Sequence, residues 1–226
     1  MRPDRAIRAA RREMQGCRFD AVLFDLLTAL LDSWTLWNAV AGNTEDGRNW
    51  RTAYLRRTYK AGAYRPYEAL VAESAAEVGL SPLLADQLAA RYGELKPWSE
   101  GLEVLSALPR DGVALGVVTN CSEQLGTKAI TCIGVAFDAV VTAERAGFYK
   151  PDPRPYQMAL DELRVAPGRC LFVAGSPYDL FGTSRLGLPA YWHDRIGTRS
   201  PLHAPKPMVY SRSLRPLRAV LHKRPD

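Results

Sequence analysis

The chain has 226 residues, of which 47% are hydrophobic and 24% are charged. This length and composition are typical of an ordinary soluble globular protein with one large core, or a core and a smaller second unit. The formal net charge is +6, but the first eighteen residues carry six arginines against two acids. The remaining chain is close to neutral, which excludes a broadly basic protein and indicates no nucleic-acid partner.

The basic stretch at 1–18 contains no apolar segment of the kind that defines a secretory signal, and no window of the sequence approaches the length of a membrane span. Its composition faintly resembles an organelle transit peptide, although a solvated tail is the commoner explanation. Cys17, Cys121, Cys132 and Cys170 show no Cys-x-x-Cys spacing, which indicates free thiols in a reducing compartment. We therefore expect a cytoplasmic protein with no membrane partner.

Short apolar runs predict the strands of a parallel sheet. They are rich in Val, Leu and Phe with little alternation, which is typical of strands that are covered on both faces. Helix-length segments at 122–133, 154–164 and 178–187 separate the later runs, and this alternation predicts a doubly wound, Rossmann-like α/β sheet. The runs are FDAVLFD (19–25), VALGVVT (113–119), FDAVVT (137–142), CLFVA (170–174) and PAYWH (189–193).

Residues 34–98 interrupt the alternation. They contain no strand-like run, but they include helical segments such as NWRTAYLRRTYKAGAY and PLLADQLAARYGEL. We expect a helical cap inserted after the first strand and closed by KPWSE at 96–100. The predicted organisation is a basic tail at 1–18, a core domain at 19–33 and 99–226, and a cap domain at 34–98.

Polar side chains follow several predicted strands at the point where each strand ends. In an open α/β sheet, ligands bind beyond the carboxyl ends of the strands, so these side chains are expected to share one edge of the sheet. The candidate functional residues at this edge are Asp25, Thr119, Asn120, Lys150, Ser176 and Asp179.

Four segments, in this order and with an insertion after the first, resemble the motifs of the haloacid dehalogenase-like hydrolase superfamily from about residue 19 to 222. They are FDLLTALLD, VVTNCS, YKPDPRPY and FVAGSPYDLFGTSRLGLPAYW. The resemblance implies that Asp25 is a nucleophile.

Most members of that superfamily are phosphatases, which carry two aspartates in the first motif and an acidic pair in the last. Here Leu27 occupies the place of the second aspartate, and Gly175 the place of the first acid of the final pair. A hard dication needs several oxygen ligands, and phosphoryl transfer needs the phosphate charge to be neutralised. We therefore predict no metal and no other cofactor, and we disfavour a Mg²⁺-dependent phosphatase.

The closer resemblance is to the 2-haloacid dehalogenase branch, which works without a metal. There an aspartate attacks the carbon that bears the halogen, and water opens the resulting ester. A halide departs without a proton, so a solitary and partly desolvated Asp25 is a suitable nucleophile, with Leu27 as a pocket wall. The resemblance implies an (S)-2-haloacid dehalogenase-type hydrolase acting on a small carboxylate.

The resemblance also implies roles for other residues. Lys150 pairs with the nucleophile and the substrate carboxylate, and Asp179 holds the lysine and activates water. Thr119 positions a substrate oxygen, and Asn120 donates to the leaving group.

Further residues are predicted to bind substrate. Arg51, on a cap helix, resembles the arginine that clamps the substrate carboxylate or receives the halide, because its planar fork of donors matches a carboxylate. Trp34 and Tyr156 are candidates for the pocket, with ordinary packing as the alternative. The remaining substrate-binding candidates are Leu27, Thr28 and Ser176.

Two departures leave the substrate open. The family's Gly-Thr after the nucleophile reads Thr28-Ala29, and its Ser-x-Asn in the last motif reads Ala174-Gly175-Ser176. Ring opening of a strained cyclic amino acid such as azetidine-2-carboxylate is one alternative, because its protonated nitrogen also leaves without a protein acid. A phosphatase and a catalytically silent binding protein are others. Related enzymes are often dimers, so a homodimer is possible.

Overall fold

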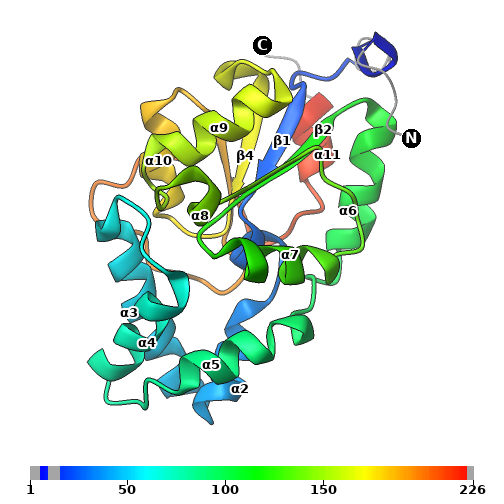
Figure 1. The fold of residues 1–226 in the computed structure, drawn as a ribbon. Helices are drawn as coiled ribbons and strands as arrows, with labels where there is room; N and C mark the ends of the chain where they lie inside the picture. The colour runs from blue at the N-terminus through cyan, green and yellow to red at the C-terminus, as the bar shows by residue number, and fades with distance from the viewer. Residues whose placement is uncertain (1–5, 10–15, 223–226) are drawn as a thin grey trace.

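The computed structural model describes residues 6–9 and 16–222, and these form a six-stranded, wholly parallel sheet in the order β3-β2-β1-β4-β5-β6 (Figure 1). The order reverses at β1, which lies between β2 and β4, as in a doubly wound fold. The predicted α/β class is therefore confirmed. The strands are β1 (Ala21–Phe24), β2 (Ala114–Thr119), β3 (Ala139–Thr142), β4 (Cys170–Ala174), β5 (Ala190–His193) and β6 (Val209–Ser211).

The strands are apolar along their length because both faces of the sheet are covered. Every residue of β1, β2, β4 and β5 is buried. Since successive side chains of a strand point to opposite faces, Val22 and Phe24 enter one hydrophobic cluster, while Ala21 and Leu23 enter the other. β6 was not predicted from the sequence, because it has three residues, none of them buried, and so shows no apolar run.

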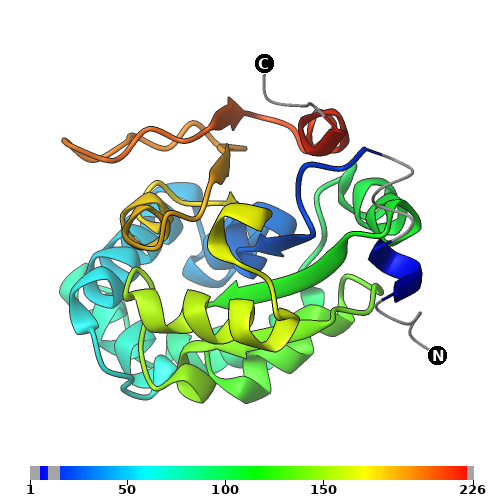
Figure 2. The ribbon, with the colours of Figure 1, turned by 90° about the horizontal axis from the view of Figure 1, so that it is seen from above.

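Helices cover both faces of the sheet, as the view from above shows (Figure 2). Tyr156 and Leu160 of α9 and Leu180 of α10 pack in the cluster of Ala21 and Leu23, and Leu105 of α6 and Leu125 of α7 pack in the other cluster. The core helices are α6 (Gly101–Ala107), α7 (Glu123–Thr131), α8 (Ala143–Ala146), α9 (Pro153–Leu163), α10 (Asp179–Arg185) and α11 (Leu217–His222), with 3₁₀ turns η3 (Leu108–Asp111) and η4 (Pro167–Arg169).

The helices that follow β1 gather at the carboxyl ends of the strands (Figure 1). Their centre is aromatic, with the Trp37 ring 4.5 Å from that of Trp50 and 5.4 Å from that of Tyr54. These helices occupy the stretch predicted as a cap, and the domain boundaries at residues 34 and 98 remain a prediction. They are α2 (Ser33–Ala41), α3 (Thr44–Ala61), α4 (Tyr67–Glu77) and α5 (Leu84–Ala90), followed by the 3₁₀ turn η2 (Tyr92–Glu94).

The cap is paired with the core through the backbone at two places. The segments that enter and leave the cap form an antiparallel bridge between Leu31 and Pro97. A second bridge joins Ala63, after α3, to Phe148, which follows α8. These contacts fix the cap helices over the edge of the sheet where ligands are expected.

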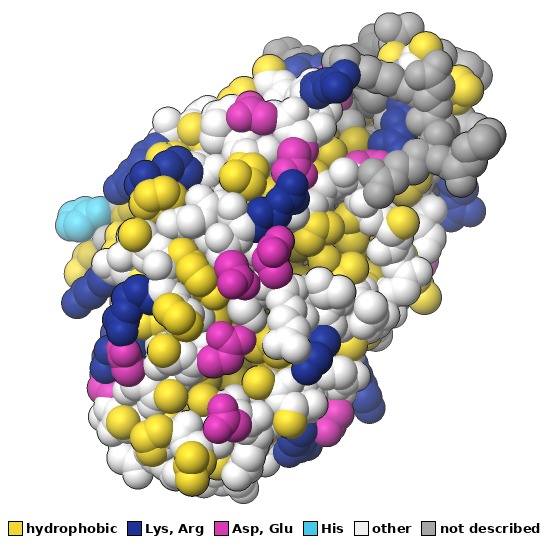
Figure 3. All heavy atoms as spheres, in the orientation of Figure 1, with side chains coloured by type: hydrophobic (Ala, Val, Ile, Leu, Met, Phe, Trp, Pro, Cys, Tyr) yellow, Lys and Arg dark blue, Asp and Glu magenta, His cyan; other side chains and the backbone are white. Residues whose placement is uncertain are grey.

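The N-terminal tail is described only in part, since 1–5 and 10–15 lie outside the described residues, so the predictions of a solvated tail or a transit peptide over these segments are not assessed. Arg8 donates two hydrogen bonds to Asp138, at 2.7 and 2.9 Å. On the face shown in Figure 3, acidic and basic side chains are mixed over core and cap. Within the described residues, none of the helices has the length and apolar character needed to span a membrane.

Glu100 ties the start of α6 to the C-terminal segment. Its side chain is 3% exposed, and its Oε1 accepts from the Leu214 N–H at 3.2 Å, from the Ser213 hydroxyl at 3.1 Å and from Arg195 at 3.2 Å. Burial alone would raise the pKa of this carboxyl. The backbone N–H groups of Glu100 and Leu214, the Ser99 hydroxyl and the Arg195 charge outweigh burial and lower the pKa from 4.5 to about 2.

Glu100→Gln is expected to lower the free energy of unfolding at pH 7 by about 1–3 kcal/mol, because it removes a charged acceptor from the buried Leu214 N–H and from the half-buried donors of Ser213 and Arg195. A carboxyl with a depressed folded-state pKa stabilises the protein above its unfolded pKa, and this contribution is lost as the pH falls from 4.5 toward about 2. Urea denaturation at pH 7, 4 and 3 checks this. The gap between the two proteins should narrow with acid, and a constant gap would contradict the assignment.

Candidate active site

Asp25 follows β1 directly and caps the π-helical turn η1 (Leu26–Leu30). Its Oδ2 accepts from the Thr28 N–H at 2.9 Å, the Thr28 hydroxyl at 2.5 Å and the Ala29 N–H at 3.3 Å. Single π-helical turns are often found at functional sites. The turn holds a carboxylate that is only 7% exposed at the carboxyl end of the central strand.

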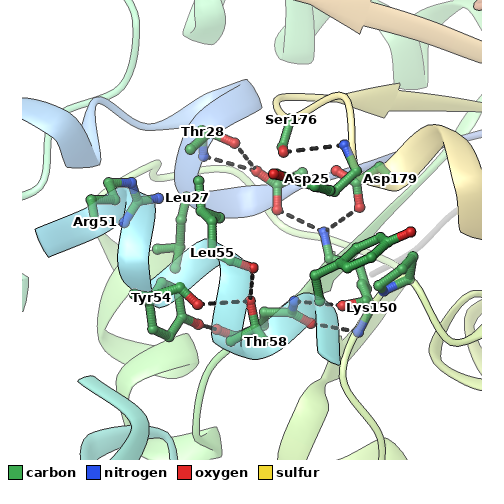
Figure 4. Close-up of a pocket in the computed structure, with 14 residues that line it drawn as sticks. Asp25, Leu27, Thr28, Arg51, Tyr54, Leu55, Thr58, Lys150, Ser176 and Asp179 are labelled. Atoms are coloured by element: carbon green, nitrogen blue, oxygen red, sulfur yellow. Dashed lines mark hydrogen bonds and ion pairs between the residues drawn. The ribbon is translucent and has the colours of Figure 1, made fainter. Parts of the chain in front are cut away.

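Lys150 lies between two buried carboxylates (Figure 4). Its Nζ is 2.7 Å from Asp25 Oδ1 and 3.1 Å from Asp179 Oδ1, and the Tyr156 hydroxyl donates to the same oxygen of Asp179 at 2.7 Å. Lys150 and Asp179 are each 5% exposed. Two carboxylates and one ammonium leave this buried group with a net charge of −1.

The two carboxyls differ in basicity. Burial would raise the pKa of Asp25, but the charge of Lys150 and the hydrogen bonds from Lys150 and Thr28 lower it below its usual value. Burial raises the pKa of Asp179, and the charge of Asp25 adds to this, while Lys150 and Tyr156 oppose it only in part. Asp25 is therefore ionised at neutral pH, and Asp179 is the more basic carboxylate.

Asn120 holds the backbone of Lys150. Its side-chain oxygen accepts from the Lys150 N–H at 2.8 Å, and its amide nitrogen donates to the Lys150 carbonyl at 3.0 Å. The hydroxyl of Tyr54, from the cap, donates to the Asn120 carbonyl at 2.6 Å. The end of β2 thus fixes the lysine that follows β3, and the cap is joined to the same point.

These groups open into a cavity of about 40 Å³ between core and cap (Figure 4). A water molecule needs about 10–15 Å³ of such space, so the cavity has room for roughly three or four water-sized groups. Of the predicted residues, those that line it are Asp25, Leu27, Thr28, Arg51, Asn120, Lys150, Ser176 and Asp179.

Arg51 enters this cavity from α3 with unsatisfied donors. The residue is 1% exposed, and its Nε and Nη1 atoms have no hydrogen-bond partner among the described residues. Its guanidinium lies 4.9 Å from the Trp34 ring centroid and 5.1 Å from that of Trp37. Buried donors without acceptors cost free energy, and a planar anion that occupied the cavity would supply the missing acceptors.

Trp34, Tyr156 and Thr119 do not line the cavity. Trp34 packs against the Arg51 guanidinium, and Tyr156 is fully buried and donates to Asp179, so both act on the site through another side chain. Thr119 is buried, with its hydroxyl oxygen 3.7 Å from the Cys121 sulfur. The geometry therefore gives no support to direct contact between these three side chains and a substrate.

Several lining residues, most of them on the cap, were not predicted from the sequence. Starting from Arg51, the positions 54, 55, 58 and 59 lie on the same face of an α-helix, so helical spacing alone could have found them. Pro151 and Tyr178 are the neighbours of predicted residues. The missed lining residues are Tyr54, Leu55, Thr58, Tyr59, Pro151 and Tyr178.

Side chains from other elements hold the carbonyls of η1. The Trp98 indole donates to the Thr28 carbonyl at 3.0 Å, and Ser33 donates to the Leu27 carbonyl. His193 Nδ1 lies 2.9 Å from the Ala29 carbonyl, which can only accept, so Nδ1 carries the proton. The turn that follows Asp25 is thereby held by Ser33 and Trp98, which lie at the two ends of the cap, and by His193 of β5.

Gly175 packs directly against the η1 turn that follows Asp25. A Cβ at this position would lie 2.1 Å from Thr28 Oγ1 and 2.3 Å from the Ala29 nitrogen. The threonine side chain and the backbone of residues 28 and 29 therefore occupy the space that a larger residue at 175 would need. The two departures from the family pattern, at positions 28 and 175, are complementary in shape.

The donor set does not fit a magnesium ion. Leu27 and Gly175 supply no side-chain ligand oxygen, and the backbone around Gly175 leaves no room for a side chain. Asp25 and Asp179 are already bridged by the Lys150 ammonium. No group of three or more His, Cys, Asp or Glu side chains in the described part of the chain is arranged to hold a metal.

Residues 22–192 match the model of the haloacid dehalogenase-like hydrolase family, and the chain belongs to this family. (S)-2-haloacid dehalogenase H-109 of Pseudomonas putida is 26% identical over 194 residues, covering 79% of this chain and 87% of that protein. A match of 31% identity to (S)-2-haloacid dehalogenase 4A of Burkholderia cepacia spans half of each chain. A phosphoglycolate phosphatase of Xanthomonas campestris is 32% identical over 197 residues, 80% of this chain and 87% of that protein.

Among solved structures, L-2-haloacid dehalogenase from Xanthobacter autotrophicus with chloropropionic acid covalently bound has a TM-score of 0.79 at 21% identity, covering 89% of this chain and 98% of that one. This similarity shows a shared fold. The predicted superfamily and the predicted class of hydrolase are confirmed by the family match and the relatives.

The complementary shapes of Thr28 and Gly175 predict an energetic coupling. Gly175→Ser alone is expected to lower the free energy of unfolding by about 1–3 kcal/mol through overpacking. In a Thr28→Gly background the same change should cost less, because the clash with Thr28 Oγ1 is removed, although the clashes with the backbone of residues 28 and 29 remain. A double-mutant cycle from urea denaturation measures the coupling, expected at about 0.5 kcal/mol or more. Strict additivity would contradict the packing argument.

Proposed function

We propose that this protein is a metal-independent hydrolase in which Asp25 displaces a leaving group from the 2-carbon of a small carboxylic acid, with 2-haloacids as the leading substrates. One observation carries the proposal: a buried, ionised carboxylate and a buried arginine with unsatisfied donors face the same small cavity. The (S)-2-haloacid dehalogenases among the relatives support this chemistry.

In the first step, the substrate carboxylate accepts hydrogen bonds from Arg51, which places C2 toward Asp25. Asp25 Oδ2 is engaged by three donors, whereas Oδ1 accepts from Lys150 alone among the described residues. Oδ1 therefore retains lone-pair density and is the attacking atom. Its bond to C2 forms as the carbon–halogen bond breaks, and the halide departs with the bonding pair without needing a proton.

In the second step, water opens the ester. Asp179 takes a proton from the water, whose oxygen attacks the carbonyl carbon of the Asp25 ester. The bond from that carbon to the substrate oxygen breaks, and this oxygen takes the proton from Asp179 and leaves as the hydroxyl of a 2-hydroxy acid. The raised pKa of Asp179 suits a base, and Asp25 is regenerated as a carboxylate with one oxygen from water once the second water proton passes to solvent.

The first test is chloride release. Incubation with L-2-chloropropionate and EDTA should release chloride, and Asp25→Asn should lower the rate by at least about 10³-fold because the nucleophile is lost. Asp32→Asn, which alters a helix cap outside the cavity, is the matched control and should retain most activity. Single turnover in H₂¹⁸O should place label in the Asp25 side chain, as peptide mass spectrometry would show. Absence of chloride from every haloacid would reject the dehalogenase assignment.

The second test concerns the carboxylate clamp. Arg51→Lys should raise KM by about tenfold or more, since lysine lacks the fork of donors, and this corresponds to at least about 1.4 kcal/mol of lost binding. Arg56→Lys is the matched control, because Arg56 lies on the same helix and pairs with Glu77 at the surface. Steady-state kinetics give the KM of both variants, and an equal change of KM in the two would contradict the role of Arg51.

Ring opening of azetidine-2-carboxylate is a second candidate that uses the same residues. The net charge of −1 on the buried Asp25, Lys150 and Asp179 group favours a substrate with a protonated ring nitrogen. Mass spectrometry of the product, which gains one water, separates this reaction from dehalogenation. Turnover of p-nitrophenyl phosphate that depends on Mg²⁺ would instead support a phosphatase function. If no substrate placed ¹⁸O label in Asp25, a catalytically silent binding protein would be favoured.

A further inference from the structure

A cysteine, a histidine and an aspartate lie in hydrogen-bonding order at the end of the sheet opposite the cavity. Cys17 Sγ is 3.5 Å from His222 Nδ1, and His222 Nε2 is 3.2 Å from Asp111 Oδ2. Cys17 precedes β1, Asp111 precedes β2 and His222 ends α11, so distant segments meet at the amino ends of the strands (Figures 1 and 2). None of these residues takes part in the chemistry proposed for Asp25.

The hydrogen bonds fix the tautomer of the histidine. Arg218 donates to both carboxyl oxygens of Asp111 at 2.8 Å, and these hydrogen bonds lower the pKa of that carboxyl despite its burial. The ionised carboxylate can only accept, so His222 Nε2 carries the proton. Nδ1 then presents a lone pair toward the Cys17 thiol, and the order of groups is nucleophile, base and orienting acid.

We propose that Cys17 is a reactive thiol that is modified by small carbon electrophiles such as α-halo carbonyl compounds. His222 Nδ1 takes the thiol proton and becomes an imidazolium held by Asp111. The thiolate sulfur forms a bond to the electrophilic carbon as the carbon–halogen bond breaks, and the halide leaves with the bonding pair. The sulfur ends as a thioether, and the proton passes from His222 to water.

The other cysteines lack this arrangement. Cys121 and Cys170 are fully buried, and burial raises the pKa of each thiol, that of Cys121 to about 12. Cys132 is half-buried like Cys17, and both sulfurs lie near backbone carbonyls, but the hydrogen bonds of the Cys132 sulfur go to carbonyls in place of an imidazole, and burial raises its pKa. Because the thiolate is the nucleophile, these thiols are expected to react slowly, and Cys132 is the matched internal control.

The test is alkylation of the folded full-length chain by iodoacetamide, followed at each cysteine by peptide mass spectrometry. At pH 7 Cys17 should react at least about tenfold faster than Cys132, with a midpoint pH below the value of about 8.5 for a free thiol. His222→Asn should lower the rate at Cys17 by about tenfold or more, because the base is lost, and leave the rate at Cys132 unchanged.

The buried Cys121 reports whether the variant remains folded. If Cys121 stays protected, an unchanged rate at Cys17 in His222→Asn overturns the proposal. If Cys121 becomes reactive in that variant, the variant has lost its fold, and the pH dependence of alkylation at Cys17 in the wild-type protein tests the proposal instead. In the wild type, a midpoint at or above about 8.5, or a rate at Cys17 no higher than that at Cys132, overturns the proposal.

Discussion

The placement of one ammonium group between two buried carboxylates is the interaction on which the site depends. Carboxylates as deeply buried as Asp25 and Asp179 are tolerated in their charged form only beside a compensating charge, and Lys150 supplies it to both. The three side chains follow β1, β3 and β4, so the parallel sheet itself brings them to one point. Asn120, at the end of β2, forms two hydrogen bonds with the backbone of Lys150 and so holds the lysine in place.

The cavity lies between the buried group of Asp25, Lys150 and Asp179, which has a net negative charge, and the positively charged Arg51 of the cap. Arg51 is held against two tryptophan rings, with donors left over in a space too small for a large ligand. The core and the cap are therefore each incomplete in a different way: the core presents a buried, ionised carboxylate, and the cap presents buried guanidinium donors without acceptors. A small acid that spans the two satisfies both, which is the physical basis of the proposed reaction.

The strands of the sheet and the polar residues at their carboxyl ends could be predicted from the sequence, because both depend on the local pattern of apolar and polar residues. Buried strands produce continuous apolar runs, and the polar residues that end them, such as Asp25 and Lys150, share an edge by topology. The fit between Thr28 and Gly175 could not be predicted, since it depends on the approach of two backbones far apart in the sequence. The His193 contact to the Ala29 carbonyl is hidden for the same reason. The short, unburied β6 carries too little pattern to be detected.

Helix α3 lines one wall of the cavity with Arg51, Tyr54, Leu55, Thr58 and Tyr59, which are successive positions of a single helical stripe. The buried Asp25, Lys150 and Asp179 follow strands of the sheet, whereas five of the residues that shape the cavity lie on this one helix. Exchange of Leu55, Thr58 or Tyr59 along that stripe would change the shape of the cavity while leaving Asp25, Lys150 and Asp179 in place. The buried charged group and the wall that shapes the cavity thus lie on different parts of the chain, and Tyr54 joins them through its hydrogen bond to the Asn120 carbonyl.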